Sequence, residues 1–302
     1  MKKFKNILIF ILLFFFLIQI FLNIKVVQNS INLSFIVFKN RVFPNLFPFL
    51  ILSGLLINYG FIDFCNATFG KFMKKLFNIS GNASFIFFMS LFTGFPSNSK
   101  YTKDLYEKGY ITLDEANRIL TFTHFSNPLF IIGTVGQFLS YKIALLILLS
   151  HYLGNIIIGI CFKKKVSNKH TYQTSKQILP FGLCLANSIK NSLDTLLLIF
   201  GTITTFFIVT SIIDSMIVVS PLFQTIINGL LEMTQGIEYV NMLNISIKFK
   251  AILIVMFISF GGISVHTQVL SIISDTNIKY KGFLISRIFH SLISGLILYL
   301  LL

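Results

Sequence analysis

Long apolar stretches alternate with short polar ones along this chain. Several apolar runs reach the ~17–25 residues that a bilayer-spanning helix needs. The following ranges read as full spans: 7–22, 46–62, 143–161, 193–213 and 283–301. Four further apolar runs are shorter, and each adjoins a polar interruption: 83–95, 129–135, 222–231 and 251–260. The pattern therefore predicts an all-α integral membrane protein, a polytopic helical bundle with re-entrant hairpins and broken helices.

The polar interruptions form two pairs, and the members of a pair lie about half a chain apart. The first half carries them at 93–99 and 126–128, and the second half at 232–236 and 261–266. Helix breaks at matching places in two halves are typical of transporters whose site lies between inverted repeats. We therefore expect an inverted repeat with a binding site where the interruptions meet.

One of these broken helices has clear boundary signals. Thr112 followed by Glu115 three residues later is a capping box, which predicts a helix start. We expect this helix to stop near Asn127, because the residue before Pro128 avoids the α region. Pro128 suits the first turn of the short helix that follows.

Composition supports the membrane assignment. The chain has 302 residues, of which 55% are hydrophobic and 12% charged, with a mean hydropathy of +0.82. Soluble domains carry roughly 25% charged residues. The net charge of +15 sits at the edges of apolar segments rather than in a basic stripe with exposed aromatics, so we expect a lipid bilayer as partner and no nucleic acid.

The three cysteines and the remaining motifs indicate no catalytic or metal chemistry. Cys65, Cys161 and Cys184 lack CxxC spacing and read as small buried hydrophobes. Lipase-type GxSxG, HExxH, phosphate-binding lysine loops and dinucleotide-binding glycine patterns are absent from the sequence. We therefore expect no enzyme, no cofactor and no metal site.

Charge patterning sets an expected topology. The basic N-terminus is placed inside, and an uncleaved first helix is favoured over a signal peptide because no small-residue cleavage site follows it. The polar stretch 25–41 is expected to be a connection, and the basic segments 71–75 and 163–165 are expected inside. The turn 214–224 lacks Lys and Arg, as an external loop should, whereas Lys248 and Lys250 fit this scheme poorly.

Several motifs carry a family resemblance from Phe43 to the C-terminus. They are FPNLFPF at 43–49, TGFP at 93–96, FTHFSNPLF at 122–130, HYL at 151–153 and SVHTQVL at 264–270. With them the chain resembles the sporulation integral membrane proteins of the YlbJ type (also called SpoVV), which belong with the nucleoside-recognition Gate domain proteins. The resemblance implies a membrane protein of endospore formers, expressed in the mother cell and needed for dipicolinic acid to pass into the forespore.

The resemblance also suggests a domain division and a place in the cell. The expected division is an N-terminal transmembrane helix and connection at 1–40, a first Gate-like repeat at 41–162, a basic cytoplasmic linker at 163–178 and a second, inverted repeat at 179–302. The expected location is a multi-pass position in the cell membrane, on the mother-cell side or in the outer forespore membrane.

A dianion such as dipicolinate needs donors at membrane depth, and the N-termini of half-helices supply free N–H groups and partial positive charge. The interruptions place neutral donors at such ends. The candidate substrate-binding residues are Thr93, Gly94, Pro96, Ser97, Asn98, Ser99, Ser126, Asn127, Pro128, Glu232, Thr234, Gln235, Gly236, Gly261, Gly262, Ser264, His266 and Gln268. For any one Ser, Thr or Asn, a hydrogen bond to the preceding turn or a neighbouring helix is the alternative.

Glu232 is the most costly of these residues in an apolar run. Proton or cation coupling, a salt bridge to Lys100, or a position at the mouth of a hairpin all remain open for it. His151 and His290 occupy equivalent places in the two halves and are expected to pack or to bond between helices. His124 lies at a break and is a candidate for a ligand or proton role.

The function expected from these observations is a transporter or channel that moves dipicolinic acid, or a similar small anion, from the mother cell towards the forespore. Two alternatives stay open. One is a non-transporting scaffold that assembles with other spore-membrane proteins, and the other is a carrier of nucleosides or other metabolites.

Overall fold

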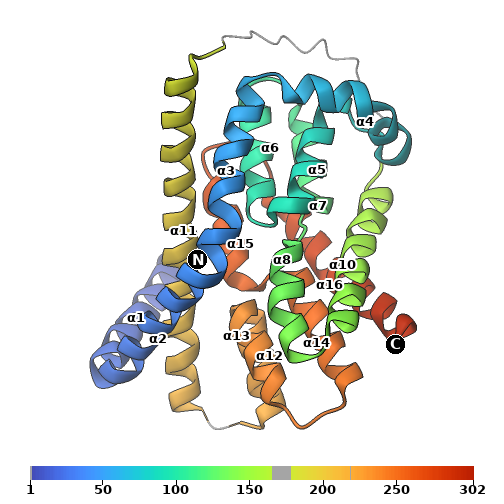
Figure 1. Ribbon diagram of the computed structural model, residues 1–302. Coiled ribbons are helices and arrows are strands. Elements are labelled where there is room, and N and C mark those ends of the chain that lie inside the picture. The colour runs from blue at the N-terminus through green and yellow to red at the C-terminus, as the bar shows by residue number, and fades with distance from the viewer. Residues whose placement is uncertain (1, 165–177, 218) are drawn as a thin grey trace.

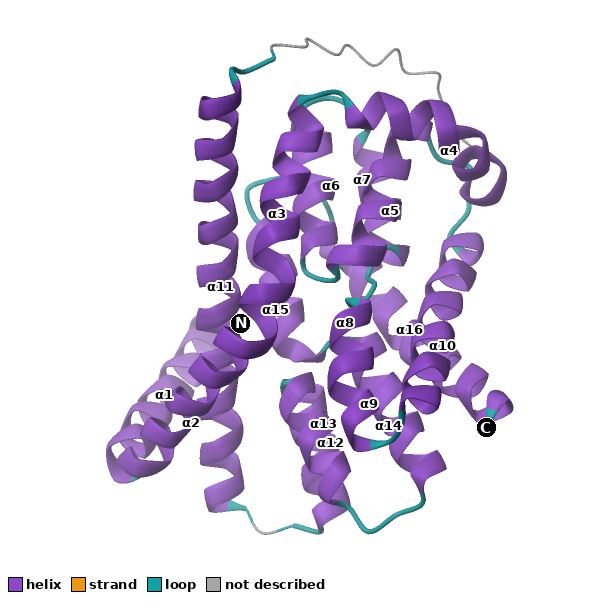
Figure 2. Cartoon of the chain, in the orientation of Figure 1, coloured by secondary structure: helices purple, strands orange, loops and turns teal. Residues whose placement is uncertain are grey.

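The computed structural model describes residues 2–164, 178–217 and 219–302, and across these ranges the regular structure is helical (Figure 2). Six of the described helices are long and apolar enough to cross a membrane. The predicted fold class, an all-α polytopic membrane protein, is confirmed. Residues 165–177, which make up most of the predicted linker, lie outside the described part of the chain.

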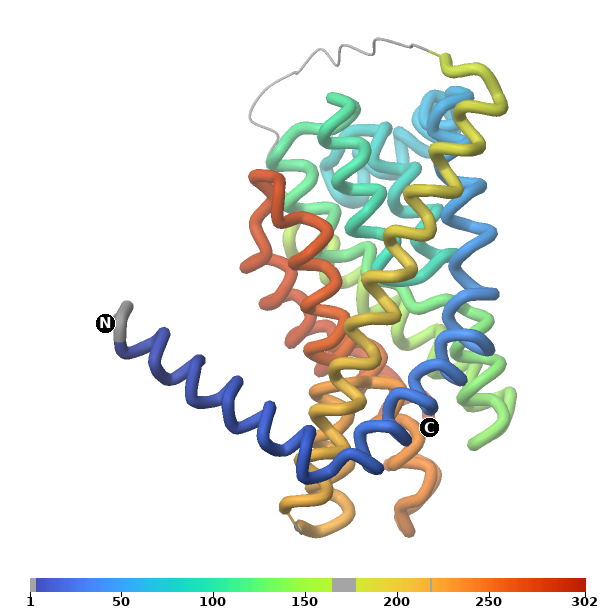
Figure 3. Tube along the Cα trace, turned by 90° about the vertical axis from the view of Figure 1, so that its left-hand side faces the viewer, coloured from blue at the N-terminus to red at the C-terminus, as the bar shows by residue number. Residues whose placement is uncertain are grey.

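Two long helices run side by side along one flank of the bundle. The first is a continuous 35-residue helix made of α2 (Ile24–Val37), a π-helical turn η1 (Phe38–Val42) and α3 (Phe43–Asn58). The second is α11 (Phe181–Met216), which packs against both α2 and α3. Ahead of them α1 (Lys2–Leu22) projects away from the body (Figures 1 and 3).

The expected connection over 25–41 is therefore wrong, because the chain is helical there. Its serine side chains make hydrogen bonds within the helix or to α11. Ser30 Oγ donates to the carbonyl of Val26 at 2.9 Å, and Ser34 Oγ lies 2.8 Å from the hydroxyl of Thr204 on α11. Hydroxyls bonded in this way allow a polar stretch to stay helical between apolar neighbours.

Two hairpins enter the bundle from opposite ends. At the upper end of Figure 1, α4 (Phe61–Phe77) bends by 104° into the segment that leads to α5 (Ser84–Thr93). α5 and α6 (Ser97–Glu107) then form the first hairpin, and α12 (Pro221–Leu231) and α13 (Met233–Met242) form the second from the lower end. Both tips lie near mid-height, so the predicted re-entrant hairpins are confirmed.

Both predicted broken helices are present, with shorter interruptions than expected at three of the four polar segments, since Thr93 ends α5 and Ser97–Ser99 belong to α6. α7 (Leu113–Phe122) begins at the predicted capping box and is followed by α8 (Pro128–Phe130), the π-helical turn η3 (Ile131–Val135) and α9 (Gly136–Phe138). α7 ends five residues before Asn127, because the backbone of 123–127 bonds to other segments.

In the second half the chain resumes its helix sooner. α14 (Ile247–Phe260) and α15 (Gly262–Ile273) are separated by Gly261 alone, so Ser264 and His266 are helical. Likewise the second hairpin tip is the single residue Glu232, and the expected tip residues 234–236 belong to α13.

The last helices of the two halves, α10 (Tyr141–Cys161) and α16 (Tyr280–Leu301), pack against each other, and both also contact α14. Arg287 lies within α16 and is fully buried. An arginine near the start of a helix can be buried in the core when its guanidinium donates hydrogen bonds to neutral acceptors.

Close packing of the second hairpin depends on two glycines that face each other. A Cβ added at Gly236 would lie 2.2 Å from the Cα of Gly229, and one at Gly229 would lie 2.4 Å from the ring of Phe257 on α14. The two arms are thus in backbone contact, and α14 covers the crossing point.

We predict that Gly236→Ala lowers the stability of the folded protein by about 1–3 kcal/mol, because overpacking forces the two arms apart. Gly201→Ala is the matched control, since Gly201 lies inside α11 with open space around its Cα. Thermal unfolding in detergent, followed by size-exclusion chromatography, measures both variants. Equal unfolding temperatures for the two variants would contradict the backbone contact.

A second prediction concerns the segments before and after α11. Lys164 precedes this helix in the chain and Ile217 follows it, and α11 runs from the upper to the lower end of the bundle (Figure 1). In a chain without native cysteines, Lys164→Cys and Ile217→Cys should react with a membrane-impermeant thiol reagent from opposite sides of the membrane. Labelling of both from the same side would rule out α11 as a spanning helix.

Candidate functional site

The first break is held open by side chains of α10. The Ser126 amide donates to His151 Nε2 at 2.9 Å, and the Asn155 amide donates to the carbonyl of His124 at 2.8 Å. The Tyr152 hydroxyl donates to the carbonyl of Leu91 at 2.5 Å and lies 3.3 Å from the carbonyl of Ser126. One helix thus replaces the partners that the interrupted backbone lost, which membrane-embedded backbone requires.

The tip of the first hairpin rests on the same break. The Phe95 amide donates to the carbonyl of Phe125 at 2.8 Å. Gly94 has a φ of 77°, and a Cβ there would lie 2.7 Å from the Asn127 amide nitrogen. Asn127 caps α8, because its Oδ1 accepts from the Leu129 amide at 2.7 Å. Hairpin tip and broken helix form one connected unit in the first half.

The second hairpin and the second break meet in a similar way. Gly262, at the start of α15, has a φ of 68°, and a Cβ there would lie 3.0 Å from the amide nitrogen of Met233. Glu232 caps α13 through a 2.9 Å bond from the Gln235 amide, and Ser264 Oγ lies 3.5 Å from its other carboxylate oxygen. The close-contact glycine sits on the hairpin in the first half and on the break in the second.

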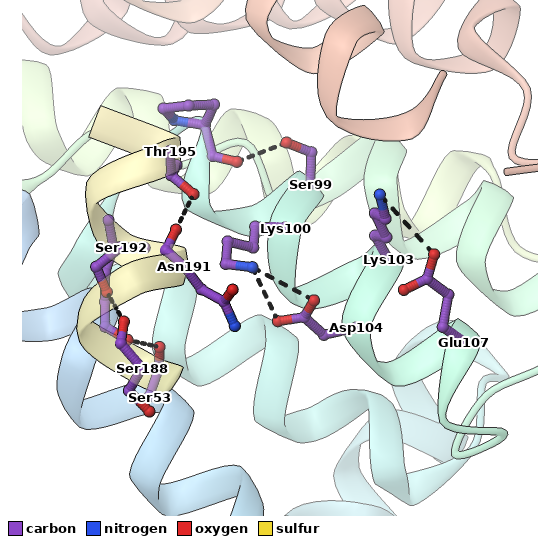
Figure 4. A network of polar contacts seen from close by, with 12 residues as sticks. Ser53, Ser99, Lys100, Lys103, Asp104, Glu107, Ser188, Asn191, Ser192 and Thr195 are labelled. Atoms are coloured by element: carbon purple, nitrogen blue, oxygen red, sulfur yellow. Dashed lines mark hydrogen bonds and ion pairs between the residues drawn. The ribbon is translucent and has the colours of Figure 1, made fainter. Parts of the chain in front are cut away.

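Glu232 is 1% exposed at the tip of its hairpin, so it does not lie at a hairpin mouth. The expected partner Lys100 lies 3.5 Å from Asp104 on its own helix, and among the described residues no ion pair involves Glu232 (Figure 4). A buried carboxylate met by neutral donors is therefore present at mid-height in the bundle.

A buried polar network joins the last helices of the two halves to α7. The Arg287 guanidinium donates to His290 Nδ1 at 2.8 Å, to Asn155 Oδ1 at 3.1 Å and to the carbonyl of Thr121. His290 Nε2 lies 2.8 Å from the carbonyl of His151. His151 and His290 thus make hydrogen bonds between helices, one of the roles considered for them from the sequence.

His124 and His266, which lie at or near the breaks, differ in their hydrogen bonding. His266 lies 2.6 Å from the hydroxyl of Tyr280 and 3.1 Å from the carbonyl of Phe260, so both ring nitrogens are engaged. His124 is fully buried, stacks on Phe95 with ring centres 4.3 Å apart, and has no hydrogen-bond partner for either nitrogen in the described structure. Its ring packs against Phe95 of the first hairpin tip and Phe283 of α16.

A pocket lies where the hairpin tips and breaks face α3 and α11. Seven of the expected binding residues line it. They are Thr93, Pro96, Ser126, Asn127, Glu232, Thr234 and Gln268. These seven come from both hairpins, the first break and α15, so the structure brings three of the four interruptions and the helix after the fourth together at one cavity.

The other eleven candidates lie outside this lining. They are Gly94, Ser97, Asn98, Ser99, Pro128, Gln235, Gly236, Gly261, Gly262, Ser264 and His266. Most support the site instead. The three glycines at positive φ set the contacts at the tips and breaks, Ser264 approaches Glu232, and Gln235 accepts a bond from Thr210 on α11. Asn98 is fully buried and its amide lacks a partner in the described structure.

The lining also contains residues that the sequence reasoning missed. The apolar ones provide most of the wall: Val42, Leu46, Phe95, Phe130, Ile199, Ile203, Met233 and Val265. The polar ones are Asn45 and Arg41, and Arg41 forms a 2.8 Å ion pair with Glu238 on α13. The available signal was an Arg inside a 35-residue helix, which the assumed connection over 25–41 concealed.

Chemically, the pocket offers apolar surface with a few polar groups at fixed positions, which is typical of small-molecule sites. Arg41 and Glu232 are the two charged residues of its lining. Within the described residues no group of three or more His, Cys, Asp or Glu side chains could hold a metal ion. The arrangement suits a small, flat solute with polar substituents.

Comparison with known proteins adds a family to this geometry. A family model described as Gate, nucleoside recognition, matches residues 40–162. The sporulation integral membrane protein YlbJ of Bacillus subtilis (strain 168) is 30% identical over 300 aligned positions, which cover 86% of this chain and 74% of that protein. No solved structure matches the chain.

The resemblance found in the motifs is thereby confirmed across most of the chain. The match to the Gate model begins beside Arg41 and includes the first hairpin and the first break. The chain belongs to the family of the sporulation integral membrane protein YlbJ and carries a Gate domain.

Proposed function

We propose that this sporulation membrane protein carries a small, flat, polar solute through the pocket between the two hairpin tips. The observation that carries the proposal is the convergence of two oppositely directed hairpins and two broken helices on one pocket lined by Arg41 and Glu232. Irregular backbone at membrane depth is tolerated where it is buried in protein or lines a cavity. A pure scaffold has no need of such a cavity.

The domain division follows from the same arrangement. Residues 41–162 form one Gate-like repeat and residues 179–302 a second, inverted one, joined by the linker 163–178. Support comes from the Gate match over 40–162 and from the hairpins, which enter from opposite ends. In this division each repeat contributes one hairpin tip and part of one broken helix to the pocket.

Dipicolinate is the solute that fits both the chemistry of the pocket and a role in spore formation. It is a rigid pyridine ring with two carboxylates, so its faces can lie against apolar walls such as Phe95, Phe130 and Ile203. Its carboxylates can accept from the guanidinium of Arg41 and from the amide of Gln268. The direction proposed is from the mother cell towards the forespore, across the outer forespore membrane.

Glu232 is proposed to be neutralised while the anion occupies the pocket. A carboxylate facing the same pocket would otherwise repel the solute, and its neighbours Thr234, Gln235 and Ser264 supply neutral donors only. Proton binding to Glu232, or a bound cation, would remove that repulsion. The protein then couples solute movement to a proton or cation.

A nucleoside is the second candidate solute, and the description of the matching family model favours it. A nucleobase is also flat and would fit between the same apolar walls. It needs no charge compensation, so Arg41 would be dispensable for it.

In the host, deletion of the gene should give spores that lack dipicolinate while the mother cell still makes it. Complementation with the wild-type gene should restore loading, and complementation with Arg41→Gln should not, because the guanidinium is then absent from the pocket. Dipicolinate in purified spores and protein in the membrane fraction are both measured. Normal loading in the deletion strain would end the dipicolinate assignment.

In vesicles, Gln268→Ala should reduce dipicolinate uptake on the order of 10-fold, the effect expected from losing one hydrogen bond to a charged group. Thr267→Ala is the matched control, because Thr267 is the neighbouring residue on α15 and does not line the pocket. Labelled dipicolinate and labelled nucleosides are compared side by side, with and without a pH gradient. Uptake of nucleosides alone would favour the second candidate, and uptake of neither would favour a scaffold.

A further inference from the structure

We propose that Arg41 is the residue that selects carboxylate-bearing solutes, and that Glu238 occupies its guanidinium until the solute's carboxylate takes that place. The proposal rests on the proposed transport function and gives its site a chemical selectivity. It starts from a single ion pair, Arg41 Nη1 to Glu238 Oε1 at 2.8 Å, which joins η1 to α13.

Arg41 belongs to two cavities at once. It lines the central pocket, and together with Asn40, Gln235, Glu238 and Tyr239 it lines a second cavity between α2, α11 and α13. Thr234 is likewise shared, whereas Glu238 faces the second cavity and not the central pocket. The guanidinium therefore stands on the boundary, with its present carboxylate partner on the far side from the central pocket.

The carboxylate of Glu238 and that of a bound solute compete for the same donors. A guanidinium presents its N–H groups in a planar fork that matches one carboxylate, and binding of a second carboxylate at that fork displaces the first. The side chains of Arg41 and Glu238 are 33% and 39% exposed. An ion pair this open contributes little free energy, so a solute carboxylate can replace it.

Displacement also has a structural consequence. Arg41 lies on the long helix that contains α2 and α3, whereas Glu238 lies on an arm of the second hairpin. α13 keeps other ties to α11, because Tyr239 donates to Asp214 Oδ2 at 2.9 Å and Thr210 donates to Gln235 Oε1. Exchange at Arg41 therefore opens the boundary between the two cavities without detaching the hairpin.

A third cavity lies beside α11, above the other two. At the upper end, Asn191 and Thr195 line a cavity that also contains Lys100 of α6 (Figure 4). Ile199 and Ile203 line the central pocket, and Phe207 lines the lower cavity. These α11 positions recur every four residues, so the contacts with the three cavities wind gradually around the helix. Arg41 stands between the central pocket and the lower cavity.

The test is equilibrium binding of labelled dipicolinate to the purified protein in lipid nanodiscs. Glu238→Gln should bind it roughly two- to five-fold more tightly, because the internal competitor is gone and an open ion pair is worth little. Arg41→Gln should bind it on the order of 10-fold more weakly or worse. Arg41→Lys should fall between Arg41→Gln and the wild type, since lysine keeps the charge and loses the fork.

Asp275→Asn is the matched control, because it breaks another open ion pair, Lys103 with Asp275 at 2.6 Å, away from the central pocket. Its affinity should equal that of the wild type. Pyridine-2,6-dimethanol, which has the same ring without carboxylates, should bind the wild type and Glu238→Gln equally. Thermal unfolding of each variant verifies that it is folded.

The outcomes separate this inference from the function on which it rests. If wild-type vesicles take up dipicolinate but Glu238→Gln binds it no more tightly, the competition is wrong and the transport function stands. If Arg41→Gln is folded and binds as the wild type does, Arg41 is not the selecting residue. If the wild type neither binds nor transports dipicolinate, the solute assignment and the inference fall together.

Discussion

An interrupted helix inside a membrane is stable only if protein groups replace the hydrogen bonds that the interruption removes. In this chain the interruption between α7 and α8 depends on one face of α10, where His151, Tyr152 and Asn155 meet the released backbone groups. Arg287 adds a bond from α16 to the end of α7. The first hairpin tip rests on this fixed backbone. The pocket lies between that tip and the second hairpin, α3, α11 and α15.

The two halves differ in how they build the helix break and the hairpin tip. The first break spans five residues and requires several side chains, whereas the second is a single glycine whose neighbours continue as helix. Likewise the first hairpin turns through a Gly-Phe-Pro segment, and the second turns at Glu232, which caps its own returning arm. The two oppositely directed hairpins therefore bring a Gly-Phe-Pro tip and a carboxylate-bearing tip to the same pocket.

Helix boundaries could be predicted from local sequence signals. Features that depend on contacts between residues far apart in the chain could not. Thr112 and Glu115 marked a helix start, and Asn127 with Pro128 marked its resumption, because capping and proline geometry act within a few residues. Arg41 was missed because its importance arises from α13, almost 200 residues later in the chain. The polar stretch around Ser34 was misread because its hydroxyl partner lies on α11. Such pairings leave no trace in the periodicity of one segment.

The length of α11 has a consequence for the energetics of crossing. Its 36 residues extend about 54 Å at 1.5 Å per residue, well beyond the ~30 Å of hydrocarbon in a bilayer. The upper half of this helix carries Lys190, Asn191 and Asp194, and the last two line a cavity together with Lys100. These polar side chains shorten the purely apolar stretch that lies beside the pocket. Under the proposed transport, a charged solute would leave polar surroundings for only a fraction of the distance between the two surfaces.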